Sequence, residues 1–333
     1  MASSYDNMND LVADLYPYFR VYKDGRVERF DDKSDSIGFS YVPPSLDDPQ
    51  TDVSSKDVTI SPYVSARLYL PKNTTANITQ KLPILVYYHG GGLVSGSAFS
   101  LLHHRYLNVL VSKSNVVAIS VEYRLAPEHD VPMIYEDCWT ALQWVAAHVH
   151  VDDEKSTIVN KDPWLTDHGD FEKLSIVGDS AGGNIVYNMA MRAGKEGGIN
   201  ENVTINGSIL AFPYLLIPIE NVEQCVSYKI WMATAPTSEA DINSPMINPL
   251  AEKAPSLSGL GCSRLLLCIG EKDEYIPREI GIRFVEGVKN SGWKGDLEFI
   301  EIENEGHCFQ MTNINTEKSR DLIKRFASFI QST

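Results

Sequence analysis

Basic residues are scarce in this chain, and long apolar runs are missing from it. Its 333 residues include 29 lysines and arginines against 44 aspartates and glutamates, which gives a formal net charge of −15. Nucleic acids and anionic membranes bind basic surfaces, so we expect neither as a partner. A membrane-spanning helix needs about 20 consecutive apolar residues, and no stretch of the sequence supplies them.

Export signals and a disulfide framework are also missing. Residues 1–10 contain neither the basic nor the apolar region of a signal peptide, so we expect a cytosolic protein. We expect it to be a monomer or a homodimer. The cysteines are odd in number, scattered, and mostly set in or beside apolar runs, which favours reduced and packed thiols. They are Cys138, Cys225, Cys262, Cys268 and Cys308.

Strand-like and helix-like patterns alternate along most of the chain. The predicted strands are residues 64–71, 83–88, 116–123, 174–178, 207–212, 264–269 and 297–303. The predicted helices are residues 102–113, 134–149, 181–194, 277–291 and 316–331. This order is typical of an α/β fold, with a mostly parallel central sheet and helices on both faces. We expect a single domain over residues 1–333.

Two segments depart from this alternation. Asp24-Gly25 lies between apolar residues and predicts a hairpin turn near the start of the chain. Later, prolines at 213 and 218 interrupt the pattern after a predicted strand. We expect residues 1–45 and about 215–258 to form a cap above the sheet.

A Gly-Asp-Ser-Ala-Gly sequence at residues 178–182 joins a predicted strand to a predicted helix. In this context Gly-x-Ser-x-Gly predicts a sharp turn that exposes the Ser180 hydroxyl at the top of the sheet. Gly178 and Gly182 lack a Cβ, so neighbouring backbone can approach them closely. Ser180 is therefore the candidate nucleophile, although the pattern alone also fits a structural turn.

A His-Gly-Gly-Gly sequence at residues 89–92 closes the predicted strand 83–88. Backbone N–H groups of such a loop can point into a cavity and stabilise the negative oxygen of a tetrahedral intermediate. Losing one such donor costs roughly 2.7–4 kcal/mol in barrier height. The N–H of Ala181, directly after the candidate nucleophile, would be a further donor. A tight turn or an anion-binding loop is the plainer interpretation.

A carboxylate and a histidine follow two later strands, in the order that a Ser-Asp-His triad requires. Asp273 follows the strand 264–269, and His307 follows the strand 297–303. His307 would take the serine proton, and Asp273 would orient the imidazole and stabilise its charged form. Asp273 could instead cap the following helix. Glu271 and Glu274 are alternative acids.

Several apolar or aromatic residues follow these motifs directly, and any of them could line a substrate pocket or simply pack in the core. The pocket candidates are Leu93, Val94, Tyr214, Leu215, Ile276 and Phe309. Asp179, beside the nucleophile, receives no catalytic role.

Together the motifs resemble the plant carboxylesterase branch of the hormone-sensitive-lipase-like α/β hydrolases, over nearly the whole chain. The motifs are residues 23–29, 89–92, 123–128, 178–184 and 306–307. The resemblance implies the α/β-hydrolase fold and no metal or organic cofactor. It also implies that Ser180, Asp273 and His307 form a catalytic triad. The oxyanion hole that it implies consists of Gly91, Gly92 and Ala181.

Within this branch the chain looks closest to the 2-hydroxyisoflavanone dehydratases and to enzymes of monoterpene indole alkaloid pathways. The cyclases of the alkaloid subgroup have altered catalytic motifs, whereas this chain keeps the complete hydrolytic set. The resemblance therefore implies cleavage of a small-molecule carboxylic ester, such as a carbomethoxy group on an alkaloid, with decarboxylation to follow.

Two other functions stay open. A dehydratase or cyclase could use His307 as a general base, with the glycine loop polarising a carbonyl group. A binding protein is the third alternative, because the gibberellin receptors resemble this family. Those receptors have lost the catalytic histidine, which is present here as His307.

Overall fold

The computed structural model describes residues 10–16, 18–30, 38–72, 81–149, 161–235 and 241–332. Within them, an eight-stranded sheet runs in the order β11-β10-β9-β8-β6-β7-β5-β4. Its strands are β4 (Val53–Ser61), β5 (Val64–Pro71), β6 (Leu82–Tyr88), β7 (Val117–Glu122), β8 (Gly169–Asp179), β9 (Ile205–Ala211), β10 (Cys262–Gly270) and β11 (Asp296–Ile302). Neighbours from β7 to β11 are parallel, whereas β4 and β5 pair antiparallel, as do β5 and β7.

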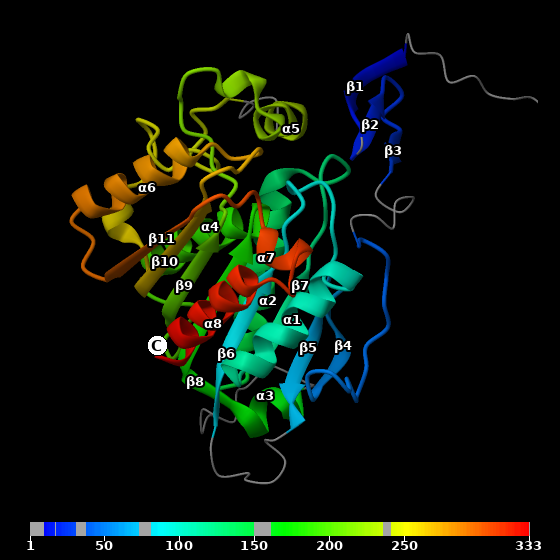
Figure 1. Cartoon of the computed structure of the whole chain (residues 1–333), viewed down its shortest axis with the longest axis vertical. Helices are drawn as coiled ribbons and strands as arrows, with labels where there is room; N and C mark the ends of the chain where they lie inside the picture. Colours follow the sequence, from blue (N-terminus) through cyan, green and yellow to red (C-terminus); the bar gives the residue numbers. More distant parts are fainter. Residues whose placement is uncertain are drawn as a thin grey trace, which may run out of the picture.

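Helices cover both faces of this sheet (Figure 1). They are α1 (Leu101–Ser114), α2 (Val131–Ala146), α3 (Pro163–His168), α4 (Ala181–Glu196), α5 (Val226–Thr234), α6 (Arg278–Asn290), α7 (Phe309–Thr312) and α8 (Glu317–Gln331). Helices α1 and α8 share one core cluster, and α2, α4 and α6 share the other. The predicted α/β fold, with its mostly parallel sheet between two helical layers, is confirmed.

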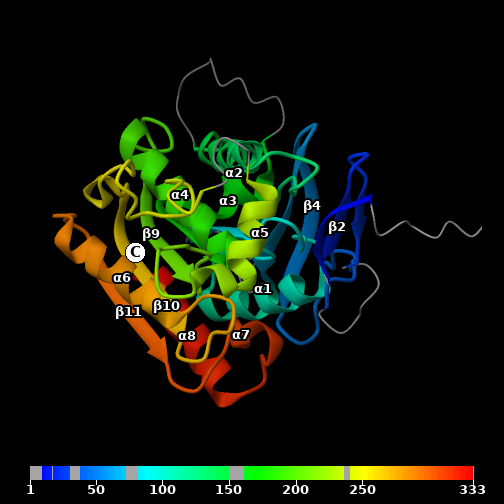
Figure 2. The ribbon, with the colours of Figure 1, turned by 90° about the horizontal axis from the view of Figure 1, so that it is seen from above.

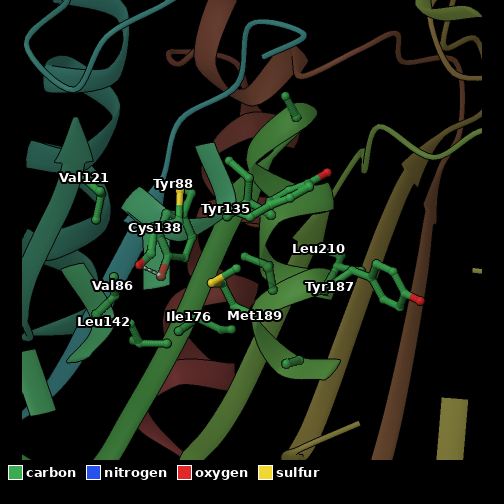
Figure 3. Close-up of a cluster of buried hydrophobic side chains, with 14 of the residues drawn as sticks. Val86, Tyr88, Val121, Tyr135, Cys138, Leu142, Ile176, Tyr187, Met189 and Leu210 are labelled. Carbon is green, nitrogen blue, oxygen red and sulfur yellow. Dashed lines mark hydrogen bonds between the residues drawn. The ribbon is translucent and has the colours of Figure 1, made fainter. Parts of the chain in front are cut away.

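The larger core lies between the sheet and the pair α2 and α4 (Figure 3). Val86 and Tyr88 of β6 and Ile176 of β8 are fully buried there. The Tyr88 hydroxyl donates a hydrogen bond to the carbonyl of Cys138 in α2, at 3.2 Å. Parallel strands buried on both faces read as continuous apolar runs, which is why the sequence located them well.

Three short strands form a separate small sheet, β1 (Leu11–Leu15), β2 (Phe19–Tyr22) and β3 (Val27–Arg29). Strands β2 and β3 pair antiparallel around Gly25, which has φ +83°, so the predicted hairpin turn is confirmed. This sheet and α5 lie on the side toward which the parallel strands run (Figures 1 and 2). Residues 1–9, 17, 31–37 and 236–240 of the predicted cap lie outside the described residues.

The sequence did not predict β4 or α5. Strand β4 mixes Lys56 and Asp57 with apolar residues and is bonded on one side only, to β5, so its pattern lacks a continuous apolar run. None of the described helices is long and apolar enough to cross a membrane. The cysteines of the sequence are all free thiols, and four of them are buried.

Candidate active site

Ser180 stands on a sharp turn between β8 and α4. Its backbone has φ +52° and ψ −116°, a conformation that costs a non-glycine residue roughly 1–3 kcal/mol. Two hydrogen bonds hold the turn: the Ser180 N–H donates to the carbonyl of Ala211 at 2.9 Å, and the Ser180 carbonyl accepts from the N–H of Tyr214 at 2.8 Å. The strained conformation is therefore imposed by the neighbouring strand β9 and the residues after it.

The two glycines around Ser180 leave no space for a side chain. A Cβ on Gly178 would lie 2.2 Å from the carbonyl of Gly182. A Cβ on Gly182 would lie 1.9 Å from the carbonyl oxygen of Tyr88 at the end of β6. The start of α4 therefore packs directly against the backbone of β6, and glycine is required for that approach.

The glycine loop after β6 folds into a tight turn beside Ser180. Gly91 and Gly92 have φ of +116° and +65°, and the Gly91 carbonyl accepts hydrogen bonds from the N–H groups of Val94 and Ser95. None of the described residues accepts a hydrogen bond from the N–H of Gly91, Gly92 or Ala181. Their role as oxyanion donors therefore stays a prediction. Gly91 and Gly92 line the cavity described below, whereas Ala181 is the buried first residue of α4.

Asp273 and His307, the candidate acid and base, form a hydrogen-bonded pair. The imidazole Nδ1 of His307 donates to Oδ2 of Asp273 at 2.7 Å. The other oxygen, Oδ1, accepts the N–H groups of Tyr275 and Ile276 at 2.9 and 2.8 Å. The carboxylate is thus fixed by its own turn, and Nε2 is the ring nitrogen left for proton transfer. Asp273 does not cap α6, since the residue at that position is Pro277.

Neither rival carboxylate contacts the imidazole ring in the described structure. Glu271 accepts the N–H of Asn304 at 2.8 Å, and Glu274 accepts the backbone N–H of His307 at 3.3 Å. Both therefore shape the loop that carries His307. Asp273 is the acid placed at the ring.

Ser180 and His307 line one cavity of about 330 Å³, together with Gly91 and Gly92. Four aromatic rings contribute to its walls: those of Tyr18, Phe39, Tyr214 and Tyr275. The Tyr18 hydroxyl, from the small sheet, lies 3.3 Å from the Tyr275 hydroxyl. Segments far apart in the sequence therefore meet over Ser180, the candidate nucleophile.

Two of the six predicted pocket residues, Tyr214 and Ile276, line this cavity. The remaining four are not among the residues that line this cavity and are buried in the hydrophobic core. These are Leu93, Val94, Leu215 and Phe309. The turn closed by the Gly91 carbonyl places Leu93 and Val94 in the core, so adjacency to the glycine loop did not bring these two side chains into the wall.

The sequence also missed Tyr18, Glu274 and Tyr275 as cavity residues. Glu274 and Tyr275 directly follow Asp273, so closeness to the acid was an available signal. Tyr18 gave no signal, because it reaches the site only through the docking of the small sheet.

Asp179, next to Ser180 in the chain, is buried and also reaches the cavity. Burial raises the pKa of its carboxyl group to about 6, although a hydrogen bond from the Tyr87 hydroxyl opposes the rise. A Cβ on Gly90 would lie 2.4 Å from Asp179 Oδ2, so the carboxylate packs directly against the glycine loop. His89 is buried in the same region, where burial lowers its pKa to about 4 and keeps it neutral.

Comparisons with known proteins agree with this geometry. Residues 85–311 match the family described as the α/β-hydrolase fold. The chain is 47% identical to a 2-hydroxyisoflavanone dehydratase of Glycyrrhiza echinata and 44% identical to catharanthine synthase of Catharanthus roseus, over 99% of each chain in both cases. The chain belongs to the plant carboxylesterase branch of the α/β-hydrolase family.

The solved structures agree with the α/β-hydrolase fold. An esterase of Pyrobaculum calidifontis is similar to this α/β hydrolase, with a TM-score of 0.64 and 26% identity, over 84% of each chain. No group of three or more metal-binding side chains occurs among the residues that the structure describes.

Proposed function

We propose that this α/β hydrolase is a serine carboxylesterase acting on an ester of a small plant metabolite. The arrangement of Ser180 on its strained turn, in one cavity with the His307–Asp273 pair, carries the proposal. The relatives named above act on small plant compounds, which supports the substrate class. An alkaloid methyl ester, whose acid loses CO₂ after hydrolysis, is the member of that class that the sequence favours.

In this mechanism, Ser180 Oγ attacks the ester carbonyl while His307 Nε2 takes the hydroxyl proton. The N–H groups of Gly91, Gly92 and Ala181 stabilise the oxyanion of the tetrahedral intermediate. The carbon–oxygen bond to the alcohol then breaks, and His307 returns the proton to the departing alcohol. Water repeats the sequence on the acyl-enzyme and releases the acid. Throughout, Asp273 stabilises the imidazolium form of His307.

The cap is part of the same proposal. The Ser227 hydroxyl, at the start of α5, donates to the carbonyl of Tyr275 at 2.8 Å, and the Tyr214 hydroxyl donates to the carbonyl of Ser227. The Tyr18 hydroxyl continues this chain of contacts to the small sheet. We propose that residues 1–45 and about 215–258 together cover the cavity within a single domain.

An elimination is the second candidate reaction, because one relative is named as a dehydratase and is as similar as the others. The same His307 could remove a proton next to a carbonyl held by the glycine loop. Such a reaction forms no bond to Ser180, so the two mechanisms differ in one covalent intermediate.

A fluorophosphonate probe and a p-nitrophenyl ester distinguish the two. We expect the wild-type protein to be labelled and to hydrolyse the ester, and we expect both signals to vanish in Ser180→Ala. A folded wild-type protein that is neither labelled nor active would contradict the esterase proposal and favour His307-driven elimination. Circular dichroism of both proteins controls for folding.

A further inference from the structure

The walls of the cavity carry negative charge and no permanent positive charge. None of the described residues that line it is a lysine or an arginine. Two carboxylates, those of Asp179 and Glu274, are part of the lining. His103 also lines the cavity, but burial holds its pKa well below the ordinary value, so its ring is neutral. His307 hydrogen-bonds the carboxylate of Asp273, which balances a positive charge on the imidazole. An anionic ligand would therefore meet repulsion here.

Glu274 is the exposed carboxylate of this wall. Its Oε2 accepts the backbone N–H of His307 at 3.3 Å, and a Cβ on Gly306 would lie 2.8 Å from the same oxygen. Among the ion pairs of the described residues, Glu274 takes part in none. Its charge is thus held against the histidine loop without a basic partner, and it is available to a ligand.

Aromatic rings stand beside this carboxylate. The ring of Tyr275 lies 5.2 Å from the ring of His307, and its hydroxyl lies 3.3 Å from that of Tyr18. Burial raises the pKa of Tyr18, and its hydrogen bond with Tyr275 and the nearby Glu274 add to the rise, so the Tyr18 phenol stays neutral close to a negative charge. Aromatic faces and a carboxylate together attract a cation, most strongly one with a diffuse charge such as an alkylammonium group.

We infer that the cavity selects esters that carry a protonated or quaternary amine, with Glu274 as the specificity-determining residue that holds the ammonium group beside the Tyr18 and Tyr275 rings. The inference rests on the proposed esterase function and adds the charge of its substrate. A cavity of this kind would favour a basic plant metabolite over a neutral one of similar size. The interaction lies at a solvent-exposed carboxylate, so its effect is moderate and sensitive to salt.

Paired esters of equal shape test the inference. The first pair is the p-nitrophenyl ester of trimethylammonio-butanoate and its carbon isostere, the dimethylhexanoate ester; the second is acetylcholine and dimethylbutyl acetate. For each pair, the ratio of kcat/KM for the charged ester to that for the neutral ester is measured in wild type and Glu274→Gln. In at least one pair we expect the variant to lower this ratio roughly tenfold. The neutral ester reports any general damage, because glutamine can still accept the His307 N–H.

Two further measurements complete the test. Glu279→Gln, which removes an exposed carboxylate outside the cavity wall, should leave the ratio unchanged. Added salt should lower the wild-type ratio but not that of Glu274→Gln. A ratio that Glu274→Gln leaves unaltered in both pairs overturns the inference and leaves the esterase proposal intact.

Binding measured without turnover keeps the two proposals separate. Calorimetry of benzyltrimethylammonium should show roughly tenfold weaker binding to Ser180→Ala/Glu274→Gln than to Ser180→Ala. This holds even if no ester is hydrolysed, an outcome that would contradict only the proposed function. Equal binding to both proteins would overturn the inference.

Discussion

Gly182 and Tyr88 meet backbone to backbone at the centre of the site, where a Cβ on the glycine would lie 1.9 Å from the tyrosine carbonyl oxygen. The contact joins the first turn of α4, which follows the nucleophile, to the end of β6, which leads into the glycine loop. It therefore sets the distance between the candidate nucleophile and the candidate oxyanion donors. A clash with backbone cannot be relieved by a side-chain rotation.

Gly182→Ala should consequently destabilise the protein by about 3 kcal/mol or more, because either α4 or β6 must shift. Urea unfolding followed by circular dichroism measures the loss. Gly259→Ala is the matched control, since a Cβ there meets only the end of the Met191 side chain, at 3.7 Å. Equal stability of the two variants would show that the start of α4, next to the turn at Ser180, tolerates a side chain.

Asp273→Asn separates the orientation of His307 from the stability of the loop. The asparagine oxygen can still accept the N–H groups of Tyr275 and Ile276, so we expect a nearly unchanged melting temperature. Its amide would face Nδ1 of His307 and favour the tautomer with the proton on Nε2, which cannot act as a base. We expect kcat for a p-nitrophenyl ester to fall about ten-thousand-fold.

Glu271→Gln is the control for that measurement, because Glu271 touches the backbone of the histidine loop but not the ring. Its kcat should stay within about threefold of wild type, as surface changes of this kind have small effects. If the two variants lost activity to a similar extent, the loop as a whole, and not the tautomer of His307, would account for the loss.

The sequence predicted the core of the fold because its signals are local. Strands β6, β8, β9 and β10 are buried on both faces and appear as apolar runs, and the turn residues that follow them carry the polar motifs. The pairing of Asp273 with His307 followed from the order of those motifs. By contrast, β4 contains charged residues and depends on its pairing with β5, which no local pattern shows.

The cavity wall could not be predicted in the same way. Tyr18 and Tyr275 are 257 positions apart, and only the docking of the small sheet brings their hydroxyl groups together. Leu93 directly follows the glycine loop, yet its backbone has φ +66° and its side chain is buried. Orientation within a loop depends on such dihedral angles, and one sequence does not specify them.

Asp179 gives the protein a pH-dependent stability. Because burial raises the pKa of its carboxyl group from 3.8 to about 6, the folded state binds a proton more tightly than the unfolded chain. The stability that this group contributes is complete below pH 3.8 and is lost as the pH rises toward 6. Between pH 5 and 7.5 the free energy of unfolding of wild type should fall by about 1 kcal/mol more than that of Asp179→Asn.

Urea unfolding of both proteins at the two pH values gives this difference. Asparagine preserves an acceptor for the Tyr87 hydroxyl, so the variant should remain folded. The paired comparison cancels the titrating groups that do not interact with Asp179. Parallel changes in wild type and variant would mean that Asp179 keeps an ordinary pKa and stays charged over this range.

Arg29 attaches the small sheet to the body of the protein, and its loss should weaken substrate binding before it affects overall stability. The guanidinium donates to the carbonyls of Val94 and Ala126 and pairs with Glu128. Without these bonds the sheet that carries Tyr18 is held less firmly over the cavity. We expect Arg29→Ala to raise KM for a p-nitrophenyl ester about fivefold or more, with a smaller change in kcat.

Glu128→Gln, which removes the ion pair but leaves both carbonyl contacts, should have a smaller effect on KM. A melting temperature that falls while KM stays constant would instead assign Arg29 to the stability of the core and separate the small sheet from the function of the cavity.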